Sequence, residues 1–115
     1  MINVQLSRNK GYKWFTKENL FVKGFIFTPD NKLLREESLL TYFSCVYSFD
    51  DFQTKIRQAN GLFSIIIKKE NTLWATVDST RAFPLFYYHN NESMIITDNP
   101  EELKSHQIPD RKSVV

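Results

Sequence analysis

The sequence predicts an α+β domain in which helices pack on antiparallel β-sheets. Strand-like alternation of apolar and polar residues occurs in the first third of the chain and again over residues 62–98. Between these regions, residues 36–60 carry apolar side chains at the three-to-four spacing of amphipathic helices. The chain has 115 residues, 42% of them hydrophobic, which is enough for one core and for a single domain.

Strands are expected at the start of the chain. Residues 1–6 alternate between apolar and polar side chains, and residues 12–15 indicate a second, short strand. Residues 18–34 then predict a longer strand, a turn at 28–31 that contains Pro and Asp, and a short continuation. Apolar residues on both faces of the longer strand predict a central position in its sheet. One face carries Leu20, Val22, Gly24 and Ile26, and the other carries Phe21, Phe25 and Phe27.

Two helices are expected in the middle of the chain. The first covers residues 36–47 and has one apolar stripe, formed by Leu39, Leu40, Phe43 and Tyr47. The second covers residues 48–60, with Ser48 as its N-cap and two Asp residues in its first turn. Asn60–Gly61 is expected to end this helix. Its predicted buried positions are Phe49, Phe52 and Ile56.

The second half of the chain predicts four strands, which most simply form an antiparallel meander. They cover residues 62–69, 73–79, 84–89 and 94–98. A short helix is expected to follow. Its signals are Asn99 as N-cap, Pro100 at the first helical position and Glu102 at the third, where it can close a capping box.

Composition excludes several classes of function. The net charge is +2 and the Lys and Arg residues are scattered along the chain, so no nucleic-acid partner is expected. No apolar run is long enough to span a membrane, and the first residues do not resemble a signal peptide. A single cysteine allows no disulfide within the chain. These features together predict a cytoplasmic protein.

Neither the cysteine nor the histidines predict chemistry. Cys45 lies between Phe43 and Val46 on the predicted helix, where a lone cysteine is usually a small buried hydrophobic residue. His89 and His106 and the scattered carboxylates lack the spacing of metal ligands, so no metal site is expected.

Three segments of the second half together resemble a known family. Residues 60–79 (NGLFSIIIKKENTLWATVDS) are similar to a segment in which Gly and an aromatic residue precede two strands that end in Asp. Residues 78–88 (DSTRAFPLFYY) are similar to an Asp-x-x-Gly-x-x-Pro-Leu-Tyr-Tyr run. Residues 94–104 (MIITDNPEELK) are similar to a strand that ends in Ser-Glu and leads into a helix. The family is the N-terminal glutaminase domain of asparagine synthetases, a class II glutamine amidotransferase domain of the N-terminal-nucleophile (Ntn) hydrolase type.

The resemblance implies more about the fold than the periodicity does. It implies stacked antiparallel sheets with flanking helices, as a reduced form of the αββα sandwich of Ntn hydrolases. It also implies an amidotransferase-like domain over residues 1–107 and a tail or linker over residues 108–115. That linker would lead to a C-terminal domain outside this sequence.

The chain departs from the family where the family's chemistry lies. Residues 22–27 (VKGFIF) occupy the place of a Val-Asn-Gly-Glu-Ile-Tyr strand, but Lys23 replaces the Asn that helps form the oxyanion hole and Phe25 replaces the Glu. Ile2 stands where the family's nucleophilic Cys follows the initiator Met. The family's Arg-His-Arg-Gly-Pro-Asp and Thr-Gly-Ser-Asp segments, which hold glutamine, have no counterpart. No catalytic residue is therefore expected.

The resemblance assigns expected roles to two small sets of residues. Gly24, Asn60 and Gly61 match family positions and would be the vestigial binding residues. Asp78, Arg81 and Pro84 are expected to brace a structural turn, with contact to a partner domain or ligand as the alternative.

The resemblance implies a non-catalytic scaffold for an ATP-dependent, amide-forming synthetase domain that is absent from this chain. ATP and Mg²⁺ would belong to that domain, so no cofactor is expected here, and the parent protein would be an asparagine synthase-like ligase. One alternative is a standalone protein-interaction module, and another, less favoured, is an active glutamine amidohydrolase. The sequence leaves open whether the chain forms a homodimer.

Overall fold

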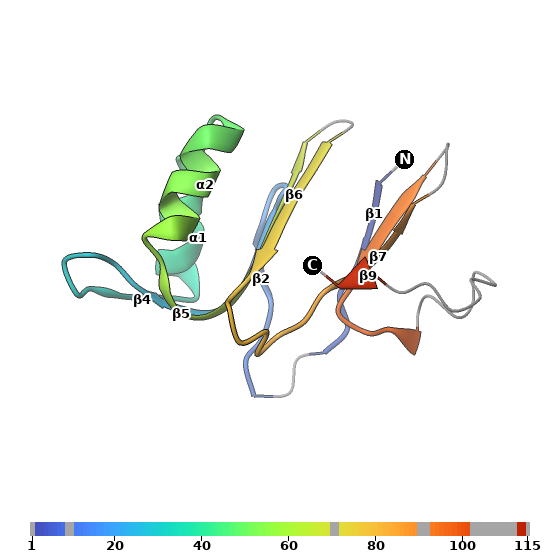
Figure 1. Ribbon diagram of the computed structural model, residues 1–115, viewed down its shortest axis with the longest axis horizontal. Coiled ribbons are helices and arrows are strands. Elements are labelled where there is room, and N and C mark those ends of the chain that lie inside the picture. The colour runs from blue at the N-terminus through green and yellow to red at the C-terminus, as the bar shows by residue number, and fades with distance from the viewer. Residues whose placement is uncertain (1, 9–10, 70–71, 90–92, 102–112, 115) are drawn as a thin grey trace.

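The computed structural model of the protein describes residues 2–8, 11–69, 72–89, 93–101 and 113–114. These residues form two mostly antiparallel sheets and two helices, which is an α+β arrangement (Figure 1). The elements are β1 (Ile2–Gln5), β2 (Phe15–Lys17), β3 (Leu20–Phe27), β4 (Leu33–Arg35), α1 (Glu37–Ser44), α2 (Phe49–Arg57), β5 (Asn60–Lys69), β6 (Thr72–Val77), β7 (Phe86–His89), β8 (Met94–Thr97) and β9 (Ser113–Val114).

The described elements stack in three layers. Figure 1 shows α1 and α2 on one side of a five-stranded sheet, and a four-stranded sheet on its other side. The five-stranded sheet has the order β2-β3-β5-β6, and β4 also pairs with β3. The four-stranded sheet has the order β1-β8-β7-β9, in which β1 and β8 are parallel.

Two apolar cores fill the spaces between the layers. The core between the helices and the five-stranded sheet contains Leu39, Leu40 and Phe43 from α1, packed on Val22 and Ile65 of the sheet. The core between the two sheets is built around three fully buried residues, Ile66, Leu85 and Ile96. The five-stranded sheet is therefore apolar on both faces, which explains why its central strands read as nearly continuous apolar runs.

Strand β3 is central, as predicted. It pairs with β5 along its whole length, and with β2 and β4 on its other edge. The backbones of β3 and β5 approach each other closely at Gly24 and Gly61, where no side chain lies between them. A Cβ atom on Gly24 would lie 2.0 Å from the Leu62 carbonyl oxygen, and one on Gly61 would lie 2.3 Å from the Phe25 carbonyl oxygen.

The predicted four-stranded meander is wrong. Strands β5 and β6 form a hairpin in the five-stranded sheet, whereas β7 and β8 form a hairpin in the other sheet. The chain changes sheet between Asp78 and Leu85, and Leu85 is fully buried between the sheets. Strand periodicity identifies each hairpin, but it does not say whether two successive hairpins share a sheet.

The helices are correctly predicted but shorter than expected. The side chain of Ser48 accepts a hydrogen bond from the N–H of Asp51, which confirms it as the N-cap of α2. Helix α1 ends at Ser44, so Tyr47 does not join its stripe and is 82% exposed. Phe49, predicted to be buried, is 47% exposed. Asn60–Gly61 does not end α2, because Arg57 is its last residue and Asn60 begins β5.

The chain ends and turns agree with the prediction in part. The turn at 28–31 is present, with the Asn31 N–H bonded to the Thr28 carbonyl oxygen.

The second strand begins at Phe15 rather than at residue 12, because it pairs with β3 across the two residues Glu18 and Asn19. The Glu101 N–H donates to Asn99 Oδ1, as expected of an N-cap, but Glu102 lies outside the described residues. Residues 113–114 of the predicted tail pair with β7.

Neither helix in the described part of the chain has the length and apolar character needed to cross a bilayer.

Substitution of Gly24 by Ala is expected to destabilise the protein strongly. Gly24 has φ +98° and its Cα faces the β5 backbone, so Ala adds both conformational strain and a backbone clash. We expect a loss of about 3 kcal/mol or more in the free energy of unfolding, measured by urea denaturation. Gly11→Ala is the matched control. Gly11 has φ +81° but no atom within 4 Å of the added Cβ, so this variant should lose only about 1 kcal/mol. Equal losses for the two variants would contradict the close-approach argument.

Candidate functional site

The most unusual polar group of the protein is the Lys23 ammonium. Lys23 lies on the central strand β3 and is only 5% exposed. Its side chain points to the face that meets the second sheet, where Nζ donates a hydrogen bond of 2.7 Å to the Arg8 carbonyl oxygen. Nζ also lies 5.6 Å from the centre of the Trp14 ring and 5.1 Å from that of Phe83, at cation–π distance. The ammonium is thus held by one carbonyl and two aromatic faces.

The Asp98 carboxylate is the second charged group at this place. It follows β8 directly, is 5% exposed, and accepts three hydrogen bonds. Its donors are the backbone N–H groups of Ser7 and Arg8, at 2.9 and 2.7 Å, and the Trp14 indole N–H, at 2.9 Å. Three donors offset the cost of burying a carboxylate. The residues that follow β1 and the residue that precedes β2 are therefore tied to the end of β8.

Burial dominates the electrostatics of Lys23. Desolvation lowers the pKa of its ammonium below the usual 10.5, the nearby Asp98 carboxylate opposes this shift, and the Arg8 charge adds to it. The protein therefore bears a cost for keeping this side chain charged. The carbonyl oxygen of Arg8 and the two ring faces reduce that cost, because each of them stabilises a positive charge.

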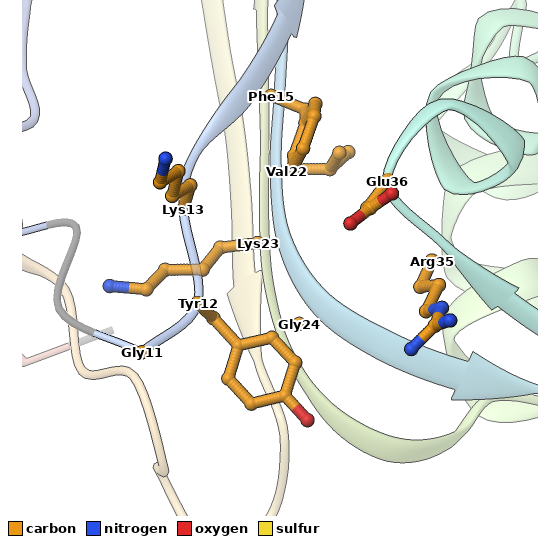
Figure 2. Close-up of a pocket in the computed structure, with 9 residues that line it drawn as sticks. All are labelled: Gly11, Tyr12, Lys13, Phe15, Val22, Lys23, Gly24, Arg35 and Glu36. Atoms are coloured by element: carbon orange, nitrogen blue, oxygen red, sulfur yellow. The ribbon is translucent and has the colours of Figure 1, made fainter.

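Two cavities lie on either side of Lys23. One has a volume of about 660 Å³ and opens at the end of the inter-sheet space, with Arg8, Phe83, Phe86 and Asp98 among its lining residues. The other has a volume of about 500 Å³ and lies along the edge of β3. Figure 2 shows this second cavity with Tyr12 and Lys13 on one side and Arg35 and Glu36 on the other.

The second cavity fills a gap in the sheet edge. Strand β2 pairs with β3 only as far as Val22, and β4 pairs with β3 only from Phe25 onwards. Gly24 lies between these two limits and forms part of the cavity wall (Figure 2). In the figure the Lys23 side chain leaves β3 between Lys13 and Tyr12 and points away from Arg35.

Asp78 forms a polar corner where the chain passes from one sheet to the other. Its buried carboxylate accepts hydrogen bonds from the N–H groups of Phe63, Thr80 and Ala82 and from the Thr80 hydroxyl. Arg81 contacts Asp78 through its own N–H, which donates to the Asp78 carbonyl oxygen at 3.0 Å. Arg81 has φ +54°, a left-handed conformation that usually favours glycine.

Hydrogen bonding decides the charge state of Asp78. Desolvation raises the pKa of its carboxyl, but the hydrogen bonds from Thr80, Phe63 and Ala82 outweigh it, so the pKa lies below the usual 3.8. The carboxylate is a fixed acceptor for the backbone of the corner, and all its donors come from within the domain.

The three residues expected as a vestigial binding site do not converge on one cavity wall. Gly24 lines the cavity beside β3. Gly61 pairs with Ile26, and its Cα faces the backbone of Phe25 and Ile26. Asn60 is exposed at the start of β5. Pro84 lines the inter-sheet cavity, three residues beyond Arg81.

Sequence reasoning missed the group formed by Lys23, Asp98, Arg8 and Trp14. One signal was available, because a lysine inside the otherwise apolar run VKGFIF at the centre of a sheet must find partners. Its partners are remote in sequence, and only the fold brings them together. Cys45, predicted to be buried, is exposed at the end of α1, with its thiol 3.9 Å from the Thr41 carbonyl oxygen. The described residues contain no group of three or more side chains suited to hold a metal ion.

Comparison with known proteins gives no relative: no family model, no curated protein and no solved structure matches this chain.

Asp78→Asn is expected to destabilise the protein in a pH-dependent way. The carboxylate is stabilised in the folded state and its pKa is lowered, so its contribution is present above about pH 3.8 and is lost as the pH falls through the folded pKa. At neutral pH we expect a loss of about 2–3 kcal/mol, because an amide cannot accept from all four donors. Denaturation of both proteins at several pH values measures the difference. A difference that stays constant down to strongly acidic pH would contradict this role.

Lys23→Met is expected to lose stability relative to the wild type as the pH rises. Because the folded pKa of Lys23 is lowered, the unfolded state binds more protons between that pKa and 10.5, so the wild type gains stability as the pH rises through this window. The variant has no such group, and its stability relative to the wild type should fall across the same window. Urea denaturation up to pH 10.5 tests this, with Lys32→Met, at an exposed position, as the matched control. A relative gain by Lys23→Met at high pH would contradict the burial argument.

Proposed function

We propose that this chain is a non-catalytic class II glutamine amidotransferase-like domain of an asparagine synthetase-like protein. It acts as a scaffold for an ATP-dependent, amide-forming synthetase domain that lies outside this sequence. The proposal includes an Ntn-type arrangement over residues 1–107. In the segment that follows, Ser113 and Val114 still belong to the four-stranded sheet through their pairing with β7. In this reading the domain contributes shape and contact surface, while ATP, Mg²⁺ and the amide-forming chemistry belong to the partner domain.

The observation that carries the proposal is that the Lys23 ammonium is bound by groups within the domain. In the resembling family the side chain at this position is an amide that helps bind an oxyanion. Here it is an ammonium that points into the space between the sheets and is bound by Arg8, Trp14 and Phe83. The neighbouring carboxylate of Asp98 is likewise occupied by three donors. The polar groups at this end of the sandwich hold the two sheets together, which suits a structural role.

The position of the thiol supports the same proposal. Cys45 is the only cysteine of the chain, and it lies exposed at the end of α1 in the outer layer. A nucleophilic thiol needs a neighbouring base or cation to raise its thiolate fraction. The contact of the Cys45 sulfur with the Thr41 carbonyl oxygen supplies neither.

A standalone interaction module is the second candidate, and a row of aromatic rings favours it. The ring of Tyr12 lies 5.3 Å from Phe83 and 6.1 Å from Phe25, and Phe25 lies 5.9 Å from Phe27. Tyr12 is 42% exposed and Phe27 is 41% exposed, so the row is accessible. The coding sequence beyond Val115 separates the candidates. A Ser-Gly-Gly-x-Asp-Ser ATP loop favours the scaffold, and a stop codon favours the module.

The purified protein is expected to release no glutamate from glutamine. A coupled glutamate dehydrogenase assay measures this, with an active class II amidotransferase as the positive control. Lys23→Asn, which restores the side chain of the family, should also be inactive because it supplies no nucleophile. Glutamate release that Cys45→Ser abolishes would overturn the non-catalytic assignment.

A further inference from the structure

The outer edge of β6 is open in the described part of the protein. Strand β6 ends the five-stranded sheet, and among the described strands it pairs only with β5. The Asp78 N–H donates a hydrogen bond to the Phe63 carbonyl oxygen. In an antiparallel pair the backbone groups of alternate residues face the partner strand, so this bond shows which residues of β6 face β5 and which face outwards. Trp74 and Thr76 therefore bond to β5, whereas the N–H and C=O groups of Leu73, Ala75 and Val77 face outwards.

Strand β6 also lacks the features that normally keep an edge from pairing. Its sequence, Thr-Leu-Trp-Ala-Thr-Val, contains no charged residue and no proline. The other edge of the same sheet is different, because β2 ends in Lys17 and β4 ends in Arg35. An uncharged edge with outward-facing backbone groups is suited to pair with another strand. The Val77 carbonyl oxygen of this edge accepts a long bond, 3.5 Å, from the Thr76 hydroxyl.

The outward-facing residues of β6 can pair with the same residues of a second β6 strand. In an antiparallel pair of two β6 strands with a two-fold axis at Ala75, the outward-facing residues meet one another. Ala75 lies opposite its own copy, and Leu73 lies opposite Val77 of the copy. These are hydrogen-bonded positions, so the three pairs would form about six backbone hydrogen bonds. The small Ala75 side chain at the axis avoids a clash between the copies.

Helix α2 adds charge complementarity to this edge. The Phe49 ring, at the start of α2, lies 5.6 Å from Trp74, and Arg57, at its end, borders a cavity of about 260 Å³ beside Ala75 and Thr76. Helix α2 therefore runs in the same direction as β6. Its first turn is acidic and its last turn is basic.

A two-fold axis reverses the direction of the second copy. The Trp74 end of one β6 then meets the Thr76 end of the other, so the exposed Asp50 of one α2 faces the exposed Arg57 of its copy. The remaining basic residue of the last turn, Lys55, is already bonded to the Tyr42 carbonyl oxygen. The half-exposed Phe49 ring would be covered by the same contact.

We propose that β6 and α2 form a homodimer interface. Two copies of the chain pair through antiparallel β6 strands into one continuous ten-stranded sheet, with Asp50–Arg57 ion pairs between the two α2 helices. The interface lies at the edge of the five-stranded sheet, so it does not depend on the function proposed for the Lys23 region.

The state of association tests the interface directly. Light scattering after size-exclusion chromatography and sedimentation velocity, from low micromolar to submillimolar concentration, should give twice the 13.6 kDa of one chain. Ala75→Pro removes an outward N–H but leaves the bonds of Trp74 and Thr76 to β5, so it should weaken dimerisation at least about tenfold. Wild-type protein that is monomeric at every concentration overturns the proposal and leaves the edge to a different strand.

Charge reversal gives a second test that does not alter the strand. Arg57→Glu and Asp50→Arg should each weaken the dimer several-fold, and the double variant should recover it because the ion pair is re-formed with opposite polarity. Arg35→Glu, on β4 at the other edge, is the matched control and should leave dimerisation unchanged. Circular dichroism shows whether each variant is folded. A dimer that resists both Ala75→Pro and the single reversals, or a folded double variant that fails to recover, overturns the proposed geometry.

Discussion

The arrangement of this protein depends on the burial of two opposite charges where its two sheets meet. Asp98 directly follows β8 of one sheet, and Lys23 lies on the central strand of the other. Neither group could be buried alone, since an isolated charge in an apolar region costs several kcal/mol. Their partners come from the segment between β1 and β2, which supplies the N–H groups of Ser7 and Arg8, the Arg8 carbonyl and the Trp14 indole. The described residues of this segment therefore satisfy both charges at the place where the segment joins the two sheets.

A second polar corner completes the connection on the other side. The Asp78 carboxylate holds the turn that carries the chain from β6 to β7, and its donors include the Phe63 N–H of β5. Leu85, at the end of that turn, fills the space between the sheets. Each passage of the chain between the sheets is thus fixed by a buried carboxylate with several donors. This arrangement adds a defined geometry to the apolar core between the two sheets.

The partners of the buried charged groups are relevant to the function of the domain. An active site usually leaves some polar groups unsatisfied until a ligand binds. Around Lys23 and Asp98 the charged groups are instead occupied by partners within the domain, and the cavities on either side are bordered by aromatic side chains such as Tyr12 and Phe83. The β6 edge is different, because among the described strands it pairs only with β5, and its outward backbone groups face away from that partner. The proposed scaffold role and the proposed dimer interface both rest on this contrast.

The local elements and the central position of β3 could be predicted from the sequence. The apolar stripe of Leu39, Leu40 and Phe43, the Ser48 cap and the alternation of each strand are local signals, and local energetics suffices for them. Tertiary structure decided which hairpin joined which sheet and which aromatic residues stayed exposed, as Tyr47 and Phe49 did. It also decided that Lys23 is buried beside Asp98, 75 residues away in sequence. Long-range pairing of this kind leaves no periodic pattern in the chain, because it depends on where the layers meet and not on the spacing of neighbouring residues.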